Sequence, residues 1–332
     1  MKISFFEIKD WEIDYLTARL EGHSLKFFKD PLTKENVSEI SDTEIISVFI
    51  YSKITEELLS HLPNLKFIAT RSTGFDHVDL DACTKHQIFV SNVPYYGENT
   101  IAEHTFGLIL ALSRNIHKSY LRTIRNDFSI EGLKGFDLKG KTLGVVGAGH
   151  IGLHVIRVAK AFGMTVLVFD IEEDRFLAEV LGFSYVSFEN LLEGSDIISL
   201  HVPYNKHTHH LINKDNIHLI KKGAILINTA RGGVVDTDAL LEALDQGILS
   251  GAGLDVLEGE ELFLEDKRMV YNPSDLEAMT KLVKDHILLS RDNVVFTPHI
   301  AFYSQEALER ILDTTIENIS FFCSGSEFNI VN

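Results

Sequence analysis

Cysteine is scarce in this sequence of 332 residues, and its scarcity excludes several kinds of site. The two cysteines, Cys83 and Cys323, lie far apart and match no spacing typical of a metal centre or a redox motif. A fold held together by disulfides, as in small secreted proteins, is therefore disfavoured. A reducing, cytoplasmic compartment is the simpler expectation.

Positive charge is also in short supply. Lys and Arg number 31 against 48 Asp and Glu, which gives a formal net charge of -17. Such a chain would be repelled by nucleic acids and by anionic membrane surfaces, so neither is expected as its main partner. An anionic substrate would have to be bound by a few local cations.

The amino terminus lacks a long apolar run. The opening residues, MKISFFEIKDWEID, become acidic too early for a signal peptide or a membrane span, and they predict a first β-strand instead. The sequence also shows no internal repeat of fixed period and no low-complexity segment. What remains is the composition of an ordinary globular protein.

Short β-rich runs alternate with longer helical stretches along the whole chain. The predicted strands of the first part are 3–8, 46–51, 66–70 and 88–91. Those of the second part are 142–146, 165–169, 196–201, 224–228, 251–255 and 294–297. This alternation is typical of parallel sheets covered by helices on both faces, and the length is enough for two such domains. The sequence therefore predicts an α/β protein with two Rossmann-like domains, 1–98 plus 301–332 and 99–300.

Two long helices connect or complete these domains. One is predicted to begin near Asn99 or Thr100, and it would bridge the two domains. The other begins at about Ser304 and has no strand after it. We expect this terminal helix to fold back on the first domain.

The segment GAGHIG, residues 147–152, directly follows the predicted strand TLGVV and opens a helical stretch. It matches the G-x-G-x-x-G pattern of dinucleotide-binding turns. Gly147 allows the tight turn, Gly149 lets a pyrophosphate approach the backbone, and Gly152 lets the helix pack on the strand. The turn amides and the positive end of the helix dipole would hold the phosphates.

Asp170 ends the next predicted strand and bears on the choice of dinucleotide. Its carboxylate can accept hydrogen bonds from a ribose diol and would repel a 2′-phosphate. Residues 171–173 add no cation, although Arg175 lies close by. NAD is therefore expected as the cofactor in preference to NADP.

Later strands of the second domain also end on polar residues. These are Arg231 in ILINTARGGVVD, Asp255 in GLDVLEGEE with Glu260 beyond it, and His299 in VVFTPHIAFY. Ligands bind at the carboxyl ends of parallel strands in open α/β sheets. We therefore expect these side chains to meet in one crevice.

Taken in order, the motifs resemble those of NAD-dependent D-2-hydroxyacid dehydrogenases, and within that family the D-lactate dehydrogenases most of all. They are RSTGFDHVD (71–79), NVPYYGENTIAEH (92–104), GAGHIG (147–152), HVPYNKHTHHLI (201–212), NTARGGVVD (228–236), GLDVLEGE (253–260) and TPHIAFY (297–303). The resemblance covers nearly the whole chain. It implies a flavodoxin-like substrate domain, 1–98 plus 301–332, and an NAD-binding doubly wound parallel sheet, 99–300.

The resemblance implies that Arg231, Glu260 and His299 form the catalytic set, and the chemistry explains each choice. Reduction of a 2-oxo acid needs a hydride at the carbonyl carbon, a proton at its oxygen and a cation for the carboxylate. A histidine can give the proton, because its unperturbed pKa of about 6.5 lies close to working pH. A glutamate on the other ring nitrogen would stabilise the imidazolium, and an arginine would bind the carboxylate with its planar guanidinium.

Further site residues are implied by the same resemblance. For the substrate they are the backbone amides of Thr73 and Gly74, and the side chains of Tyr96, Phe302 and Tyr303. For NAD they are Gly147, Gly149, His150, Ile151, Gly152, Asp170, Val202, Pro203, Thr229, Ala230, Arg231 and Asp255. No metal is expected, because the histidines between 201 and 210 fit no standard ligand spacing.

The expected reaction is the reduction of pyruvate or a similar small 2-oxo acid by NADH. Reduction of glyoxylate or hydroxypyruvate, and action on a bulkier D-2-hydroxy acid, stay open because the same catalytic residues serve all of them. An NAD-sensing regulatory protein is an alternative of a different class, but the intact catalytic set favours an enzyme. The long helix near Thr100 resembles the family's dimer contact, so a homodimer is expected.

Overall fold

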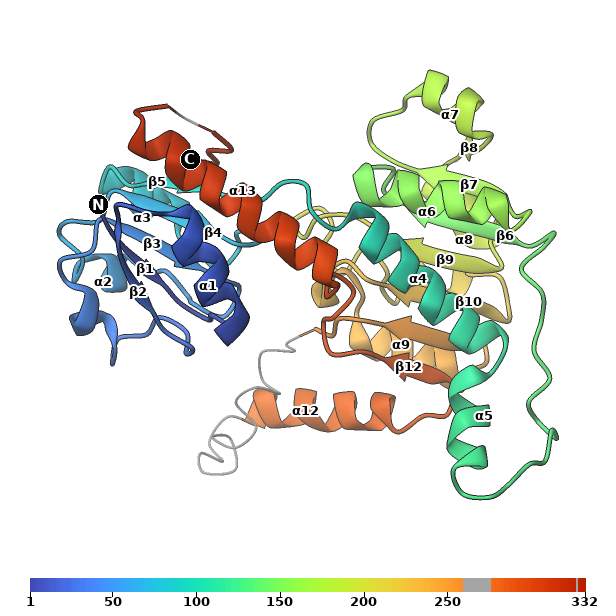
Figure 1. The fold of residues 1–332 in the computed structure, drawn as a ribbon. Helices are drawn as coiled ribbons and strands as arrows, with labels where there is room; N and C mark the ends of the chain where they lie inside the picture. The colour runs from blue at the N-terminus through green and yellow to red at the C-terminus, as the bar shows by residue number, and fades with distance from the viewer. Residues whose placement is uncertain (259–275, 327) are drawn as a thin grey trace. The chain divides into compact units, whose positions relative to one another are not determined.

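The computed structural model describes the backbone of residues 1–258, 276–326 and 328–332 (Figure 1). The chain divides into two compact units. Unit 1 comprises Met1–Tyr96 and Ser304–Asn332, and unit 2 comprises Gly97–Tyr303. Each unit is built on one parallel sheet with helices on both of its faces, which confirms the predicted fold class.

The sheet of unit 1 has the strand order β2-β1-β3-β4-β5, and all of its pairs are parallel. This is the flavodoxin-like order. The strands are β1 (Lys2–Phe5), β2 (Ser24–Phe27), β3 (Ile45–Val48), β4 (Phe67–Thr70) and β5 (Phe89–Ser91). The helices are α1 (Asp10–Arg19), α2 (Glu56–Leu59), α3 (Leu80–Lys85), α13 (Gln305–Cys323) and the 3-10 turn η1 (Val37–Ile40).

Strand side chains of unit 1 alternate between two apolar layers. On one face Phe5 and Phe67 pack with Leu312, so the C-terminal helix α13 covers this side of the sheet together with α1. On the other face Ile46 and Ile68 pack with residues of α2 and α3. Strands β3 and β4 are buried along their whole length, and β1 and β5 are buried at all but their first positions. These four strands therefore appear in the sequence as largely apolar runs, which made them predictable.

The sheet of unit 2 has seven parallel strands in the order β12-β11-β10-β9-β6-β7-β8. The strands are β6 (Thr142–Val146), β7 (Thr165–Phe169), β8 (Ser184–Tyr185), β9 (Ile197–Leu200), β10 (Ala224–Asn228), β11 (Leu249–Leu254) and β12 (Val294–Phe296). The chain runs outward from β6 to β8, then returns to β9 on the other side of β6. The result is the doubly wound arrangement with a switch point between β6 and β9.

The helices of unit 2 cover both faces of this sheet (Figure 1). They are α4 (Glu98–Ser113), α5 (Ile116–Thr123), α6 (His150–Ala161), α7 (Arg175–Leu181), α8 (Phe188–Gly194), α9 (Thr237–Asp245), α12 (Leu276–Leu289) and the 3-10 turns η2 (Ile217–Leu219) and η3 (Gly232–Val234). No helix within the described ranges has the length and apolar content of a membrane span.

Helix α4 packs directly against the sheet of unit 2. It is capped by Gly97 and starts at Glu98, one residue before the earlier of the two predicted starts. Gly253 of β11 explains how close the helix comes, because a Cβ there would lie 3.0 Å from the Cβ of Leu108. The missing side chain lets α4 lie on the strands and reach their carboxyl ends.

Candidate functional site

The carboxyl ends of the unit 2 strands carry the polar residues that the sequence singled out. In sheet order these are His299 after β12, Asp255 after β11, Arg231 after β10, the glycine turn after β6 and Asp170 after β7. The switch point between β9 and β6 lies within this row. A ligand is expected in front of such a point, because the connections on its two sides run in opposite directions.

The glycine turn is tightly packed at two of its glycines and open at the third. Gly147 has a positive φ of 95°, and a Cβ there would lie 2.6 Å from the carbonyl oxygen of His201. A Cβ on Gly152 would lie only 2.0 Å from the carbonyl oxygen of Gly147. Gly149, which caps α6, has nothing within 4 Å of the same position. The turn therefore leaves space for a phosphate where the helix amides begin.

Asp170 is fixed beside this turn by two backbone amides. Its Oδ2 accepts a hydrogen bond from the amide of Ala148 at 2.6 Å, and its Oδ1 accepts one from the amide of Glu172 at 3.1 Å. Each carboxylate oxygen has a second lone pair. The residue can thus brace the glycine turn and still accept hydrogen bonds from a ribose diol.

The turn that carries Arg231 is closed by a buried asparagine. Asn228 ends β10, and its carboxamide donates to the carbonyl oxygen of Arg231 and accepts from the amide of Ala230, both at 3.0 Å. A Cβ on Gly232 would lie 2.0 Å from the backbone of Leu257, so the turn lies against the segment after β11. The Nη1 of Arg231 donates to the carbonyl oxygen of Ala230 at 2.8 Å. The guanidinium is therefore held close to its own turn.

Asp255 holds the turn that carries His299. Its carboxylate is 1% exposed and accepts hydrogen bonds from the hydroxyl of Thr297 and from the amides of Ile300, at 3.0 Å, and Ala301, at 2.8 Å. Its carbonyl oxygen accepts from the amide of His299 at 2.8 Å. His299 itself has a φ of 54°, which is uncommon for a residue with a side chain. The buried carboxylate stabilises this backbone conformation, and such conformations are frequent at functional sites.

A family model described as the NAD-binding domain of D-isomer specific 2-hydroxyacid dehydrogenases matches residues 106–301. The chain belongs to this family. Its similarity to the D-lactate dehydrogenase of Escherichia coli strain K12 is 37% identity over 330 residues, 96% of this chain and 96% of that protein. A glyoxylate reductase of Thermococcus litoralis is 35% identical over 321 residues, 93% and 91% of the two chains.

Among solved structures, the dehydrogenase is similar to the D-lactate dehydrogenase of Aquifex aeolicus in complex with NAD and lactic acid. The identity is 43%, the TM-score is 0.88, and the match covers 97% of this chain and 96% of that one. The resemblance found in the sequence is thus confirmed. The protein is an NAD-dependent oxidoreductase that acts on the CH–OH group of 2-hydroxy acids, and the glycine turn and Asp170 fit the cofactor.

Two alanine substitutions separate the packing role of the glycine turn from its binding role. We expect Gly152→Ala to lower the free energy of unfolding by about 1–3 kcal/mol, because its methyl group meets a backbone carbonyl. Gly149→Ala should change the free energy of unfolding by less than about 0.5 kcal/mol.

The methyl group of Gly149→Ala would instead occupy the space for the pyrophosphate, so the dissociation constant of NADH should rise about tenfold or more. Denaturant unfolding and NADH fluorescence titration measure the two effects, and wild-type NADH affinity in Gly149→Ala would contradict this account.

Helix α4 supplies two supporting residues that the sequence interpretation did not single out. The Nε2 of His104 lies 2.9 Å from the hydroxyl oxygen of Thr297 and 3.4 Å from Oδ1 of Asp255. Since Thr297 donates its own proton to Asp255, the Nε2 of His104 must carry a proton and donate it. The next residue, Thr105, has its hydroxyl 3.1 Å from that of Thr229. Adjacent residues of one helix therefore contact both the His299 turn and the Arg231 turn.

Two other histidines at this edge of the sheet, His201 and His210, make structural contacts. Desolvation of the ring lowers the pKa of His201 to about 3, and its Nε2 lies 2.8 Å from the hydroxyl of Ser199. His201 is thus neutral at working pH. The Nε2 of His210 lies 3.2 Å from Oε1 of Glu258. Within the described residues, no group of three or more His, Cys, Asp or Glu is arranged to hold a metal ion.

The structure distributes the other predicted site residues over both units. In unit 1, Thr73 and Gly74 lie in the turn after β4, and the carbonyl oxygen of Tyr96 accepts a hydrogen bond from Nε of Arg310 at 2.6 Å. In unit 2, the rings of Phe302 and Tyr303 meet edge to face with centroids 5.8 Å apart. His150 and Ile151 begin α6 directly after the glycine turn, and Val202, Pro203, Thr229 and Ala230 lie in the segments after β9 and β10. Glu260 lies outside the described residues.

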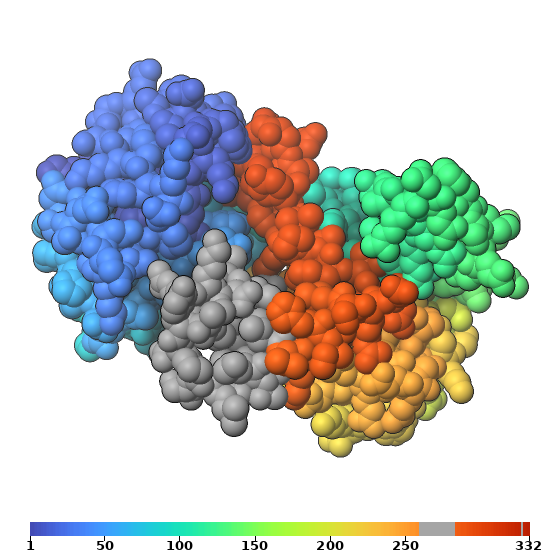
Figure 2. All heavy atoms as spheres, turned by 90° about the horizontal axis from the view of Figure 1, so that it is seen from below, coloured from blue at the N-terminus to red at the C-terminus, as the bar shows by residue number. Residues whose placement is uncertain are grey.

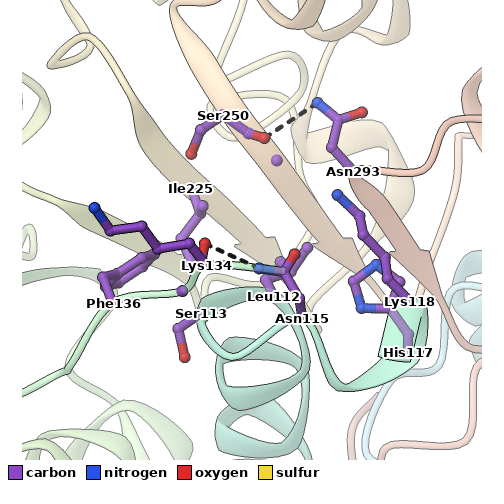
Figure 3. Close-up of a pocket in the computed structure, with 12 residues that line it drawn as sticks. Leu112, Ser113, Asn115, His117, Lys118, Lys134, Phe136, Ile225, Ser250 and Asn293 are labelled. Atoms are coloured by element: carbon purple, nitrogen blue, oxygen red, sulfur yellow. Dashed lines mark hydrogen bonds between the residues drawn. The ribbon is translucent and has the colours of Figure 1, made fainter. Parts of the chain in front are cut away.

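A cavity of about 190 Å³ in unit 2 lies far from this site (Figure 3). Its walls include Ile225, Ser250 and Asn293, which stand at the amino ends of β10, β11 and β12. The carboxamide of Asn293 donates to the carbonyl oxygen of Ser250 at 3.1 Å across one wall. Because the glycine turn and His299 follow the carboxyl ends of the strands, this cavity is not the cofactor site.

Proposed function

We propose that the dehydrogenase reduces pyruvate, or a similar small 2-oxo acid, to the D-2-hydroxy acid with NADH. One observation carries this proposal: a histidine turn and an arginine turn follow β12 and β10, on either side of β11, and each is fixed by a buried polar side chain. The similar proteins of Escherichia coli and Aquifex aeolicus are both named D-lactate dehydrogenases. A pre-positioned acid and a pre-positioned cation are what the reduction of a 2-oxo acid requires.

In this proposal NADH supplies the hydride, and residues of the chain supply the proton and the groups that bind the carboxylate. His299 gives the proton to the carbonyl oxygen, and Glu260 stabilises the resulting change in charge on the ring. Arg231 binds the carboxylate and polarises the carbonyl, as its fork of N–H donors allows. The amides of Thr73 and Gly74 also hold the carboxylate.

We propose the remaining roles on the same basis. Tyr96, Phe302 and Tyr303 would line the substrate pocket, which makes unit 1 the substrate domain and unit 2 the NAD-binding domain. The glycine turn with His150 and Ile151 would hold the pyrophosphate and Asp170 the ribose. Val202, Pro203, Thr229, Ala230, Arg231 and Asp255 would complete the cofactor contacts.

Glyoxylate reduction is the second candidate, favoured by the 35% identity to the glyoxylate reductase of Thermococcus litoralis. A panel of pyruvate, glyoxylate, hydroxypyruvate, 2-oxobutyrate, 2-oxoisocaproate and phenylpyruvate separates the candidates when kcat/KM is measured by NADH consumption. We expect pyruvate to give the highest value. A higher kcat/KM for glyoxylate or for a bulkier acid would identify that acid, and not pyruvate, as the preferred substrate. No turnover of any acid would contradict the proposed function.

We also propose that the protein is a homodimer in the cytoplasm. Helix α5 and the segment after it expose apolar side chains, and together they form a lobe at the rim of unit 2, coloured green in Figure 2. Phe128 and Ile130 are 75% and 86% exposed, and Tyr120 and Ile124 are also exposed. An apolar surface of this kind is typical of an interface between subunits.

Sedimentation velocity should show that the wild-type protein is a dimer and that Ile124→Glu weakens this dimer. A monomeric wild-type protein would contradict the proposal.

A further inference from the structure

The last residues of the chain complete the sheet of unit 1. Ile330 pairs with Ser91 in an antiparallel bridge, and the amide of Val331 donates to the carbonyl oxygen of Val90 at 2.9 Å. The carboxamide of Asn332 accepts from the amide of Val90 at 2.8 Å and donates to the carbonyl oxygen of Ile88, also at 2.8 Å. Since β5 is the edge strand of this sheet, the tail 328–332 covers its open side.

Three asparagines connect this tail to the turn after β4. The Nδ2 of Asn329 donates to Oδ1 of Asn318 on α13 at 2.9 Å. The Nδ2 of Asn318 donates to the carbonyl oxygen of Asn92 at 2.9 Å. The Nδ2 of Asn92 donates to the carbonyl oxygen of Thr73 at 2.8 Å. We call this series of hydrogen bonds the asparagine relay.

The middle of the relay is buried and its direction is fixed. Asn318 is 1% exposed and Asn92 is 8% exposed. The backbone carbonyl of Asn92 can only accept, so Asn318 must present its NH₂ group to it and its oxygen to Asn329. A buried carboxamide that lost one of these partners would leave a polar group unsatisfied, at a cost comparable to a lost hydrogen bond. The relay therefore allows one arrangement of its three side chains.

The relay ends on the peptide group that joins Thr73 to Gly74. The hydroxyl of Thr73 donates to the carbonyl oxygen of Val93 at 2.8 Å. The hydroxyl of Ser72 donates to the carbonyl oxygen of Gly74 at 2.6 Å. Within the described chain, no hydrogen bond is donated by the amides of Thr73 and Gly74 to another protein group. With its carbonyl held by Asn92, the peptide between these residues keeps its N–H pointing the opposite way.

We propose that Asn318 and Asn329 are positioning residues for the substrate, because they fix the Thr73–Gly74 peptide so that its amides can bind the substrate carboxylate. This inference rests on the proposed function, in which those amides hold the carboxylate of the 2-oxo acid. It assigns a role in substrate binding to the last helix and to the C-terminal tail. Neither element contains a residue to which the proposed function gives a contact with the substrate.

Asn329→Gly is the decisive substitution. Asn329 has a φ of 54°, a conformation that glycine adopts without strain, so the change removes the carboxamide and keeps the backbone. Asn318→Ala removes the middle of the relay. Asn332→Ala is the matched control, since it weakens the same tail at contacts with Val90 and Ile88 that lie outside the relay.

Three quantities are measured for each variant: the KM of pyruvate, the dissociation constant of oxamate from the enzyme–NADH complex, and the dissociation constant of NADH. We expect Asn329→Gly and Asn318→Ala to raise the KM of pyruvate and the dissociation constant of oxamate about tenfold, the equivalent of one lost buried hydrogen bond. The dissociation constant of NADH should stay unchanged in both variants. Asn332→Ala should lower the melting temperature without altering any of the three.

The results separate the relay from the function on which it rests. If Asn318→Ala does not fold, the measurements on Asn329→Gly alone test the role of the relay. A wild-type KM and oxamate affinity in Asn329→Gly, or equal effects in Asn332→Ala, would overturn the relay while leaving the dehydrogenase reaction in place. A wild-type enzyme that neither reduces a 2-oxo acid nor binds oxamate would instead overturn the proposed function itself.

Discussion

Replacing His299 with Asn lowers kcat for pyruvate reduction by about 10²–10⁴, the usual contribution of a positioned proton donor. Asparagine is chosen because position 299 has a φ of 54°, and asparagine tolerates this conformation better than most residues. The substitution therefore removes the titrating ring without adding backbone strain. The hydrogen bonds of Asp255 to the same turn come from backbone amides and from Thr297, so they are preserved.

Steady-state kinetics and NADH titration test this expectation together. The dissociation constant of NADH should stay at its wild-type value, since the change affects the proton and not the nucleotide. His207→Asn is a suitable control, because His207 is an exposed histidine in a polar loop of the same unit. If kcat of the His299 variant stays within a few-fold of wild type, another group donates the proton.

Arg231→Lys has the second largest expected effect, a fall in kcat/KM of about 10²–10³. Lysine keeps the positive charge but loses the planar fork that matches a carboxylate, so the comparison isolates geometry from charge. Loss of one preorganised donor to a developing charge produces a fall of this size in other enzymes. The turn itself should survive, because Asn228 holds it through the backbone of Ala230 and Arg231.

Arg231→Met completes the series by removing the charge as well. We expect kcat/KM to decrease from wild type to lysine and again to methionine, with denaturant unfolding unchanged among the three. Near-wild-type kinetics in Arg231→Lys would show that a simple cation is enough. Equal kinetics in all three proteins would contradict a role for Arg231 in the reaction.

Sequence patterns were sufficient for the fold and for the cofactor. Strands buried on both faces appear as apolar runs. The glycine turn has a spacing that its packing requires, since a Cβ on Gly152 would lie 2.0 Å from the carbonyl oxygen of Gly147. NAD as cofactor and the α/β class with two Rossmann-like domains are confirmed. Two strands were missed, β2 and β8. Strand β2 alternates polar and apolar residues over only four positions, and β8 is two residues long, so neither carries a clear apolar run.

The supporting contacts of the site could not be predicted in the same way. His104 lies far in sequence from Thr297, and Asn318 lies far from Asn92, so only the folded chain brings each pair together. Asparagine has no pattern that marks it as buried, since it usually occurs in turns and on surfaces. The roles of Arg231 and His299 remain predictions that the substitutions above address, and the role of Glu260 remains a prediction as well.

The configuration of the product tests the account most directly. Wild-type enzyme is incubated with pyruvate and NADH, and the lactate formed is resolved by chiral chromatography beside a reaction with His299→Asn. We expect D-lactate in an amount equal to the NADH consumed by the wild-type enzyme, and almost none from the variant. L-lactate, no lactate, or equal product from both proteins would contradict it.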